Sequence, residues 1–245
     1  MKLPDYLPYD RLAAPINYEW SRLIANRFQG NPAEDNPKLF KALHEISVRA
    51  AFSLGVACSE WAAARLQPHT DVSDLLLRIE AAWAATIDWR YASLPEPKSP
   101  KAPSPDPVAE AVWLTALFLS YDHGFLVETY KGLKNRGVRG SALRLALLVR
   151  HIAPKSAGFD KWLTASLMKA KEHYPAAEVP IQQEAVVPPD FYDPKFKWSE
   201  QAVRESVTRF LSSLNPGRNK YLRKAAQMQA DGFKGEPYTK PSSPS

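Results

Sequence analysis

The sequence predicts an all-α protein, a helical bundle of about seven to nine helices with a proline-rich connector and an ordered, extended C-terminal segment. Apolar residues recur at spacings of three and four along most of the chain, and no convincing run of alternating apolar and polar residues indicates a strand. The 22 prolines gather between the periodic segments, and glycine is scarce. These observations favour helices that lie between the prolines, with few helix-breaking residues inside them.

Composition restricts the class of protein. With 245 residues and 45% hydrophobic content, the chain can bury a sizeable core. A single cysteine, Cys58, excludes an internal disulfide framework and suits a reducing compartment. The N-terminus lacks the apolar core of a signal peptide, and the longest apolar stretch, 111–119, is about half of what a membrane span needs. We expect a cytoplasmic protein that does not enter the membrane.

The N-terminal half contains three periodic segments. A short amphipathic helix is expected around 20–28. An apolar stripe over 39–61 predicts one long helix, with Pro37 just ahead of it. A further helix is expected over 72–90, capped by Thr70 or Asp71.

The C-terminal half begins with the pair Asp106-Pro107, an N-cap candidate followed by a first-turn proline. The segment that follows, 108–119, is apolar almost all round, so this helix is expected at the centre of the bundle. Later periodic segments predict helices over 141–152, 159–174 and 203–214.

Proline-rich stretches suggest a division of the chain. We expect an N-terminal helical lobe over 1–93, a connector over 94–107 and a C-terminal helical lobe over 108–235. Aromatic residues among the prolines of 175–198 predict an ordered segment strapped across the helices, and 236–245 is expected to be a flexible tail. Whether the two lobes pack as one domain is left open.

Positive charge is concentrated locally, although the whole chain carries only +6. Between Thr129 and Phe159 there are seven basic residues and no acidic one. Glycines lead from this run into a helix expected to start at Ser141, where free backbone N–H groups could cradle an anion. The alternative is a solvated loop. The candidate anion- or partner-binding residues are Lys131, Lys134, Arg136 and Arg139.

A second basic site follows the turn at 215–217. Arg218, Lys220 and Arg223 flank Tyr221 there, and we include these three cations among the candidate partner-binding residues. A docked segment whose cations face water is the competing interpretation.

Motifs for catalysis or metal binding are weak. The five histidines never lie three or four residues apart, so no metal site is expected, and nothing indicates a cofactor. No Gly-x-Ser-x-Gly nucleophile motif occurs. If the protein is an enzyme, the expected place is a turn at 121–124, with Asp122, His123 and Glu128 as acid–base candidates.

The closing stretch, NPGRNKYLRKAAQMQADGFKGEPYT (215–239), resembles the tails of small, all-helical bacterial proteins associated with toxin–immunity neighbourhoods. The resemblance covers about a tenth of the chain. It implies a cytoplasmic bacterial protein that neutralises a cognate toxin or serves its secretion, and it assigns no functional residue because such proteins bind through individual surfaces.

Three hypotheses remain. The first is a non-enzymatic protein-binding module, an immunity or adaptor protein whose partner has an acidic surface. The second is a nucleic-acid-binding protein that uses the basic residues of 131–155 and 218–224. The third is an enzyme on a phosphorylated substrate, with Arg136 and Arg139 as clamps and His123 or Glu128 as the acid–base group. The sequence does not indicate the oligomeric state.

Overall fold

The computed structural model describes residues 2–98, 106–133 and 137–239, and within these ranges every regular element is a helix. Isolated antiparallel bridges join Ile46 to Pro175 and Ala92 to Leu222. The predicted all-α fold class is therefore confirmed.

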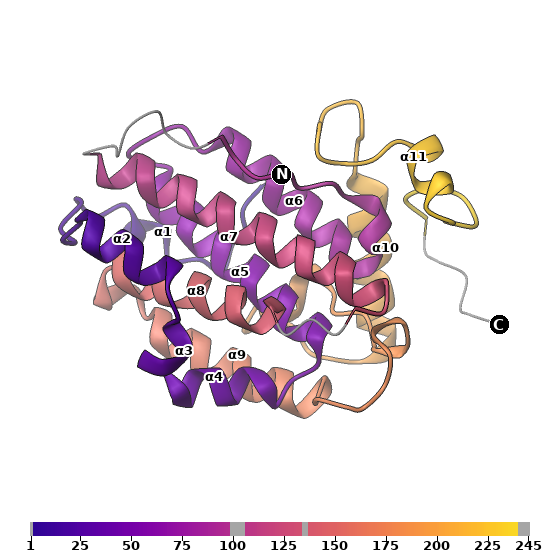
Figure 1. The fold of residues 1–245 in the computed structure, drawn as a ribbon, viewed down its shortest axis with the longest axis horizontal. Helices are drawn as coiled ribbons and strands as arrows, with labels where there is room; N and C mark the ends of the chain where they lie inside the picture. The colour runs from indigo at the N-terminus through magenta and orange to yellow at the C-terminus, as the bar shows by residue number, and fades with distance from the viewer. Residues whose placement is uncertain (1, 99–105, 134–136, 240–245) are drawn as a thin grey trace.

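The long helices α5 to α8 lie side by side at the centre of the molecule, and α10 and α11 lie at one end of it (Figure 1). No helix within the described ranges is both long and apolar enough to cross a membrane. Short 3-10 helices connect the α-helices at η1 (Trp89–Tyr91), η2 (Lys155–Ala157), η3 (Ile181–Gln183) and η4 (Pro189–Tyr192). The α-helices are α1 (Tyr9–Leu12), α2 (Arg22–Gln29), α3 (Pro32–Asp35), α4 (Pro37–His44), α5 (Val48–Leu66), α6 (Ser73–Ile87), α7 (Pro107–Tyr130), α8 (Gly137–Ile152), α9 (Phe159–His173), α10 (Glu200–Ser213) and α11 (Ala225–Ala230).

Helix α5 lies at the centre of the bundle, and of its 19 residues all but Val48 are buried. Alanine, glycine and serine make up much of the helix, and these small side chains let α6, α7 and α8 approach it closely. Helices α5 and α6 precede the proline-rich connector, whereas α7 and α8 follow it. The two lobes expected from the sequence therefore share one hydrophobic core.

Two helix starts form as their local sequence predicts. Asp106 Oδ1 accepts a hydrogen bond from the Val108 backbone N–H at 2.9 Å, with Pro107 in the first turn of α7. Asp71 Oδ1 accepts a hydrogen bond at 2.8 Å from the backbone N–H of Ser73, the first residue of α6. In both cases a carboxylate satisfies an N–H group that has no partner within the helix.

The single helix expected over 39–61 is wrong, because α4 ends and α5 begins on either side of 45–47. The Ser47 backbone N–H donates to the Tyr174 carbonyl at 2.9 Å, outside any helix. Ile46 is fully buried and pairs with the segment that follows Tyr174. The apolar spacing continues through the break because Ile46 is buried by a distant segment rather than by a helical neighbour.

Helix α7 continues through the turn expected at 121–124 and ends at Tyr130, so that prediction is wrong. Packing explains the difference, since α5 and α8 cover this part of α7 and Leu126 is fully buried there. Helix α8 begins at Gly137, which places Ser141 inside a helix rather than at its start. No helix N-terminus therefore lies at Ser141, where the anion cradle was expected.

The segment 175–198 lies across the helices, as predicted. Lys169 of α9 holds it, since its Nζ donates to the backbone carbonyls of Phe191, Asp193 and Phe196 at 2.7, 3.3 and 2.9 Å. Phe191 itself is fully buried. One cation thus satisfies three carbonyls of an irregular segment that has no regular hydrogen-bonding partner.

The C-terminal segment contacts the body of the protein as far as Thr239, although 236–245 was expected to be a flexible tail. The rings of Tyr238 and Tyr91 stack with their centroids 5.1 Å apart. The Tyr91 hydroxyl donates to the Thr239 carbonyl at 2.9 Å. Residues 236–239 are therefore packed against the body, and 240–245 lie outside the described residues.

Arg65, near the end of α5, is fully buried. Its Nε donates to the Ile152 carbonyl at 2.9 Å, which satisfies a carbonyl at the C-terminus of α8 and places positive charge at that end of the helix dipole. Its Nη1 and Nη2 donate to the N-terminal segment, at the carbonyls of Leu12 (2.8 Å), Ala14 and Pro15 (3.0 Å). One guanidinium therefore joins three parts of the chain.

We expect Arg65→Leu to lower the free energy of unfolding by about 3 kcal/mol or more, because the four carbonyls that its guanidinium bonds lose a charged donor. Urea denaturation followed by circular dichroism measures the change. Arg204→Leu, at an exposed position on α10, is the matched control and should alter stability by less than about 0.5 kcal/mol. Equal effects of the two substitutions would contradict the role assigned to Arg65.

Glu60 lies on α5 and is buried. Its Oε1 accepts a hydrogen bond from Trp83 Nε1 at 2.8 Å, whereas Oε2 has no hydrogen-bond partner in the described structure. Burial raises the pKa of Glu60 to about 8, although the hydrogen bond from Trp83 opposes the change. The carboxyl group is therefore protonated in the folded protein below that pH.

In the unfolded chain Glu60 returns to its ordinary pKa of 4.5, so between that value and about 8 the folded state binds more protons. The contribution of Glu60 to the free energy of unfolding should therefore fall as the pH rises from 4.5 to about 8, by roughly 3 to 5 kcal/mol in all. Glu60→Gln keeps an acceptor for Trp83 and should remove this contribution. The measurement is the difference in unfolding free energy between the two proteins at several pH values, and a constant difference would refute the prediction.

Candidate functional site

The three acid–base candidates, Asp122, His123 and Glu128, do not converge. All of them lie on α7, where successive side chains are rotated by about 100° around the helix axis. Asp122 faces α5, where its Oδ2 lies close to Gly55. His123 is buried, whereas Glu128 is exposed. The structure therefore brings together no acid–base pair from this set.

Asp122 is fully buried, and neither carboxyl oxygen has a hydrogen-bond partner in the described structure. Burial raises the pKa of Asp122 well above its ordinary value, against the opposing charge of Arg144. A Cβ atom on Gly55 would lie 2.6 Å from Asp122 Oδ2, so α5 and α7 approach this closely only because that residue is glycine. Asp122 is a neutral carboxyl group of the core.

His123 packs against the residues around η1. Burial lowers its pKa to about 4, although the neighbouring backbone of Trp89 and Ala92 opposes the change. The imidazole is therefore neutral in the folded protein at ordinary pH. Asp122 and His123 are both buried, whereas a substrate would bind at the surface of the protein.

Arg139, one of the predicted anion-binding residues, donates to backbone carbonyls. Its Nε donates to the Leu43 carbonyl at 2.9 Å and its Nη2 to the Ile46 carbonyl at 3.0 Å. These bonds satisfy carbonyls at and just after the C-terminus of α4, which would otherwise lack partners. The structure thus uses Arg139 to join α8 to the break between α4 and α5.

Among the described basic residues of 129–159, Lys131 and Arg150 make contacts with different parts of the protein. The Lys131 ammonium lies 5.6 Å from the ring centroid of Trp89. Arg150 Nε donates to Asp160 Oδ1 at 2.6 Å. Lys134 and Arg136 lie outside the described residues. A run of positive charge in the sequence therefore becomes several separate contacts.

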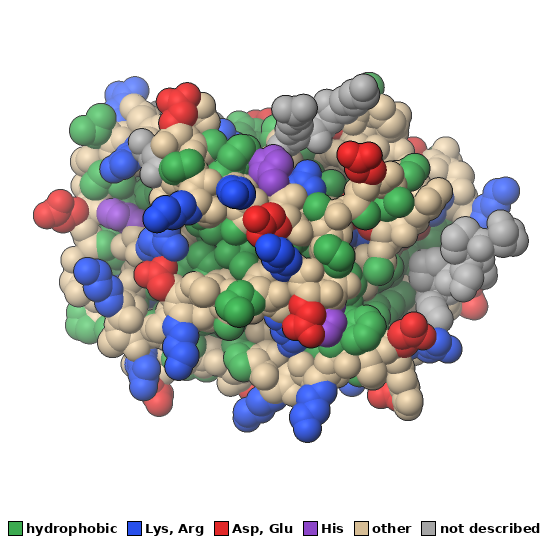
Figure 2. Space-filling view, turned by 90° about the horizontal axis from the view of Figure 1, so that it is seen from below, with side chains coloured by type: hydrophobic (Ala, Val, Ile, Leu, Met, Phe, Trp, Pro, Cys, Tyr) green, Lys and Arg blue, Asp and Glu red, His purple; other side chains and the backbone are tan. Residues whose placement is uncertain are grey.

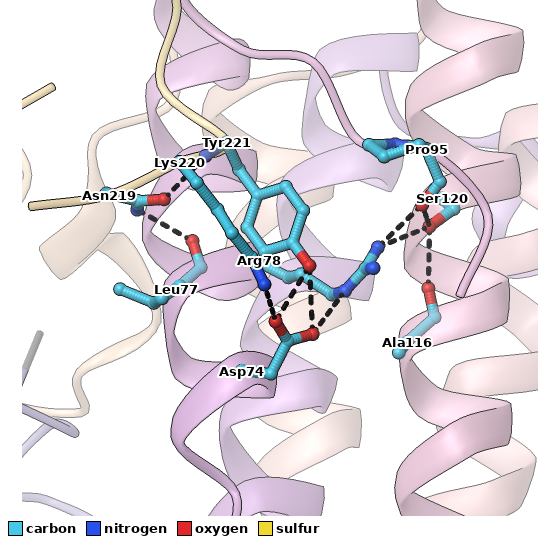
Figure 3. A network of polar contacts seen from close by, with 9 residues as sticks. All are labelled: Asp74, Leu77, Arg78, Pro95, Ala116, Ser120, Asn219, Lys220 and Tyr221. Atoms are coloured by element: carbon cyan, nitrogen blue, oxygen red, sulfur yellow. Dashed lines mark hydrogen bonds and ion pairs between the residues drawn. The ribbon is translucent and has the colours of Figure 1, made fainter. Parts of the chain in front are cut away.

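The second basic site, by contrast, is part of a polar network around Asp74 of α6 (Figure 3). Asp74 Oδ1 lies 2.6 Å from Lys220 Nζ and accepts a hydrogen bond from the Tyr221 hydroxyl at 2.8 Å. Asp74 Oδ2 accepts from Arg78 Nε at 2.9 Å, and Arg78 Nη1 continues to the Pro95 carbonyl at 2.7 Å. The network joins α6, the connector and the C-terminal segment.

Backbone hydrogen bonds fix the same junction. The Ser93 N–H donates to the Tyr221 carbonyl, and the Arg223 N–H donates to the Tyr91 carbonyl, both at 2.9 Å. Asn219 Nδ2 donates to the Leu77 carbonyl on α6 at 2.8 Å, next to the Asp74 network (Figure 3). The C-terminal segment is therefore held by main-chain and side-chain bonds together.

An open pocket of about 720 Å³ lies at this junction, and we call it the C-terminal pocket. Although burial would raise the pKa of Asp74, hydrogen bonds from Lys220, Arg78 and Tyr221 lower it overall, so Asp74 is ionised and fully engaged. Among the described residues of the lining, cations outnumber acids. Its charged residues are Arg78, Lys98, Lys220 and Arg223, with Asp74 and Glu96.

Two of the predicted partner-binding residues, Lys220 and Arg223, therefore line one pocket, and Arg218 is exposed in the turn before them. The Arg223 guanidinium pairs with Asp231, whereas Arg218 has no side-chain partner within the described structure. Sequence reasoning missed Arg78, which is buried. Its position beside the apolar stripe of its helix was the available signal, because a cation there requires a buried partner.

Charge is mixed elsewhere on the surface. Figure 2 shows one face of the molecule, on which Lys and Arg side chains are interspersed with Asp and Glu. A nucleic-acid backbone is bound by a broader field of one sign. This face does not provide such a field.

Within the described residues, the metal-ligating side chains and the cysteine thiol do not indicate a catalytic site. Within the described ranges, no three His, Cys, Asp or Glu side chains gather so that they could hold a metal ion. Cys58 is buried on α5, and burial raises the pKa of its thiol above the ordinary value. The thiolate that would act as a nucleophile is therefore disfavoured.

Comparisons of this chain with protein families, with curated proteins and with solved structures found no match. A function is therefore inferred from the geometry of this chain. In that geometry, the C-terminal pocket is where predicted partner-binding residues meet at a concave surface.

We expect Asp74→Asn to lower stability by about 1–3 kcal/mol, because a neutral amide cannot pair with Lys220 and Arg78 together. Hydrogen exchange at the Ser93 and Arg223 amides should accelerate, since these groups bond across the junction. Asp71→Asn is the control, because asparagine also caps helices. Unchanged exchange in Asp74→Asn would show that the network does not hold the junction.

Proposed function

We propose that the protein is a non-enzymatic binding module that recognises an acidic segment of a protein partner through the C-terminal pocket. The observation that carries this proposal is the excess of cations among the described lining residues of an open pocket, one of whose two acids, Asp74, is already paired with cations. Lys98 in the lining and Arg218, which shortly precedes the lining residue Lys220 in the chain, are exposed, and neither has a side-chain partner within the described structure. Acidic side chains of a partner can therefore pair with both.

The mixed charge of the pocket favours a protein over a nucleic acid. Glu96 would repel a continuous phosphate backbone, whereas a protein segment can place a cation opposite Glu96 and its acids opposite Lys98. Complementary charges of this kind speed the encounter and select the partner more than they strengthen the complex. Acids within a cationic pocket are therefore compatible with specific protein recognition.

The most specific form of the proposal is an immunity or adaptor protein of a bacterial toxin or secretion system. It is supported by the resemblance of 215–239 to the tails of toxin–immunity-associated proteins. The stretch 215–239 includes Lys220 and Arg223, which line the C-terminal pocket. The segment that bears the resemblance thus also contributes residues to the candidate site.

The test begins with the full chain as bait, and the proteins it retains after nuclease treatment are identified and purified. Each purified candidate is then titrated with wild-type protein and with the double variant Lys98→Glu/Arg218→Glu. We expect the double variant to bind about tenfold more weakly or worse, because two attractive contacts become repulsive. Raising the salt concentration should reduce this difference.

Lys38→Glu is the matched control, since Lys38 is an exposed lysine on α4 and does not line the C-terminal pocket. Helix α4 lies at the opposite edge of the molecule from α6 and α11 (Figure 1). It should bind the partner as wild type does. A partner that binds the double variant with undiminished affinity would sink the proposal. Retention of nucleic acid alone would favour the phosphate-backbone hypothesis instead.

A further inference from the structure

One tyrosine near the C-terminus has an uncommon backbone conformation. Tyr238 has a φ of +58°, and it is the only non-glycine residue with a positive φ within the described ranges. This left-handed region is unfavourable for a residue with a Cβ atom, and a bulky residue is rarely found in it. The conformation therefore persists because contacts of the Tyr238 side chain stabilise it.

The Tyr238 side chain is held by an aromatic ring and by backbone oxygens. Its ring stacks on that of Tyr91, with the planes 21° apart and the centroids 5.1 Å apart. Its hydroxyl donates to the Arg223 carbonyl and lies 3.4 Å from the Tyr91 carbonyl. We call the Tyr91 ring and these two carbonyl groups the Tyr238 site. An aromatic face together with acceptors for a hydroxyl is the chemistry that recognises a phenol.

The Tyr238 site is also held together by contacts that do not involve Tyr238. The Arg223 N–H donates to the Tyr91 carbonyl at 2.9 Å, which keeps the two carbonyl-bearing segments side by side. The Tyr91 ring packs against the ring of Phe233, with the centroids 5.4 Å apart. A ligand that replaced Tyr238 would therefore find the site already formed, and binding would need little reorganisation.

Two tyrosine hydroxyl groups join the segment 236–239 to the body of the protein. Within the described ranges, the hydrogen bonds between this segment and the rest of the chain are those of the Tyr238 hydroxyl and one that the Tyr91 hydroxyl donates to the Thr239 carbonyl. Gly235 directly precedes the segment with a φ of +111°, where the absence of a side chain gives the backbone a pivot. The segment can therefore leave the body as a unit.

We propose that the Tyr238 site binds a tyrosine side chain of the protein partner, and that Tyr238 occupies the site until the partner displaces it. A tyrosine of the partner would make the same stack and hydrogen bond without a left-handed backbone, so the exchange releases strain in this chain. The site shares Arg223 with the C-terminal pocket, so one partner segment can present its tyrosine to the first and its acids to the second. In naming its ligand this inference rests on the proposed function, whereas the site itself does not.

The test uses N-acetyl-tyrosinamide as the probe, titrated into the full chain and followed by amide NMR shifts. Tyr238→Ala should bind the probe about tenfold more tightly than wild type, because it lacks the tethered competitor. The shifts should map to Tyr91 and Arg223. N-acetyl-phenylalaninamide should bind Tyr238→Ala about fivefold more weakly than the probe, because it cannot donate to the carbonyls. Tyr238→Phe keeps the ring without the hydroxyl, so its affinity for the probe should fall between those of wild type and Tyr238→Ala.

Tyr9→Ala is the matched control, because the Tyr9 hydroxyl also donates to a backbone carbonyl, that of Pro4 at 2.9 Å, near the opposite terminus of the chain. It should bind the probe as wild type does, and thermal unfolding of each variant verifies that it is folded. No binding to Tyr238→Ala at millimolar concentration, equal affinity for the tyrosine and phenylalanine derivatives, or shifts that map away from Tyr91 would each overturn the proposal.

The probe is uncharged, so adding Lys98→Glu and Arg218→Glu to Tyr238→Ala should leave its binding unchanged. A partner whose affinity survives this charge reversal would therefore refute the proposed function without contradicting the Tyr238 site. Failure of the probe to bind would instead refute the tyrosine ligand, and the charge contacts of the C-terminal pocket would still be decided by the partner titration.

Discussion

The burial of α5 on all sides is the constraint on which the rest of the structure depends. A helix without a solvent-facing side leaves its polar side chains only protein groups as partners, and each partner fixes the segment that supplies it. Arg65 fixes the N-terminal residues and the end of α8, and Glu60 fixes Trp83. The Tyr192 hydroxyl, which donates to the Ala50 carbonyl at 2.9 Å, fixes the segment 175–198.

The cations of the chain fall into two groups that the sequence does not distinguish. Arg65, Arg78 and Arg139 donate to backbone carbonyls and hold irregular segments or helix ends. Lys98 and Arg218 instead remain exposed beside a pocket. The guanidinium groups of the first group bond to the protein's own carbonyls. A run of basic residues in the sequence therefore does not by itself indicate a basic surface. The proposed recognition of a partner depends on the second group.

Local chemistry explains which elements were predictable. The starts of α6 and α7 depend on Asp71 and Asp106, whose side chains bond to N–H groups two residues further along, and both were predicted. The break at 45–47 depends on Tyr174 and its neighbours, and the continuation of α7 through Gly124 depends on packing against α5 and α8. Neither cause can be read from the neighbouring residues in the sequence, because both involve contacts with distant segments.

By itself, the sequence determined the all-α class, the capped helix starts and the two clusters of cations, because each depends on residues close together in the chain. Only the tertiary structure decided that Asp122 and His123 are buried apart and that Lys220 joins Tyr221 at Asp74. A contact between such distant residues forms only after the helices between them have packed. The candidate site is therefore a property of the packed bundle, whereas its helices are properties of their own segments.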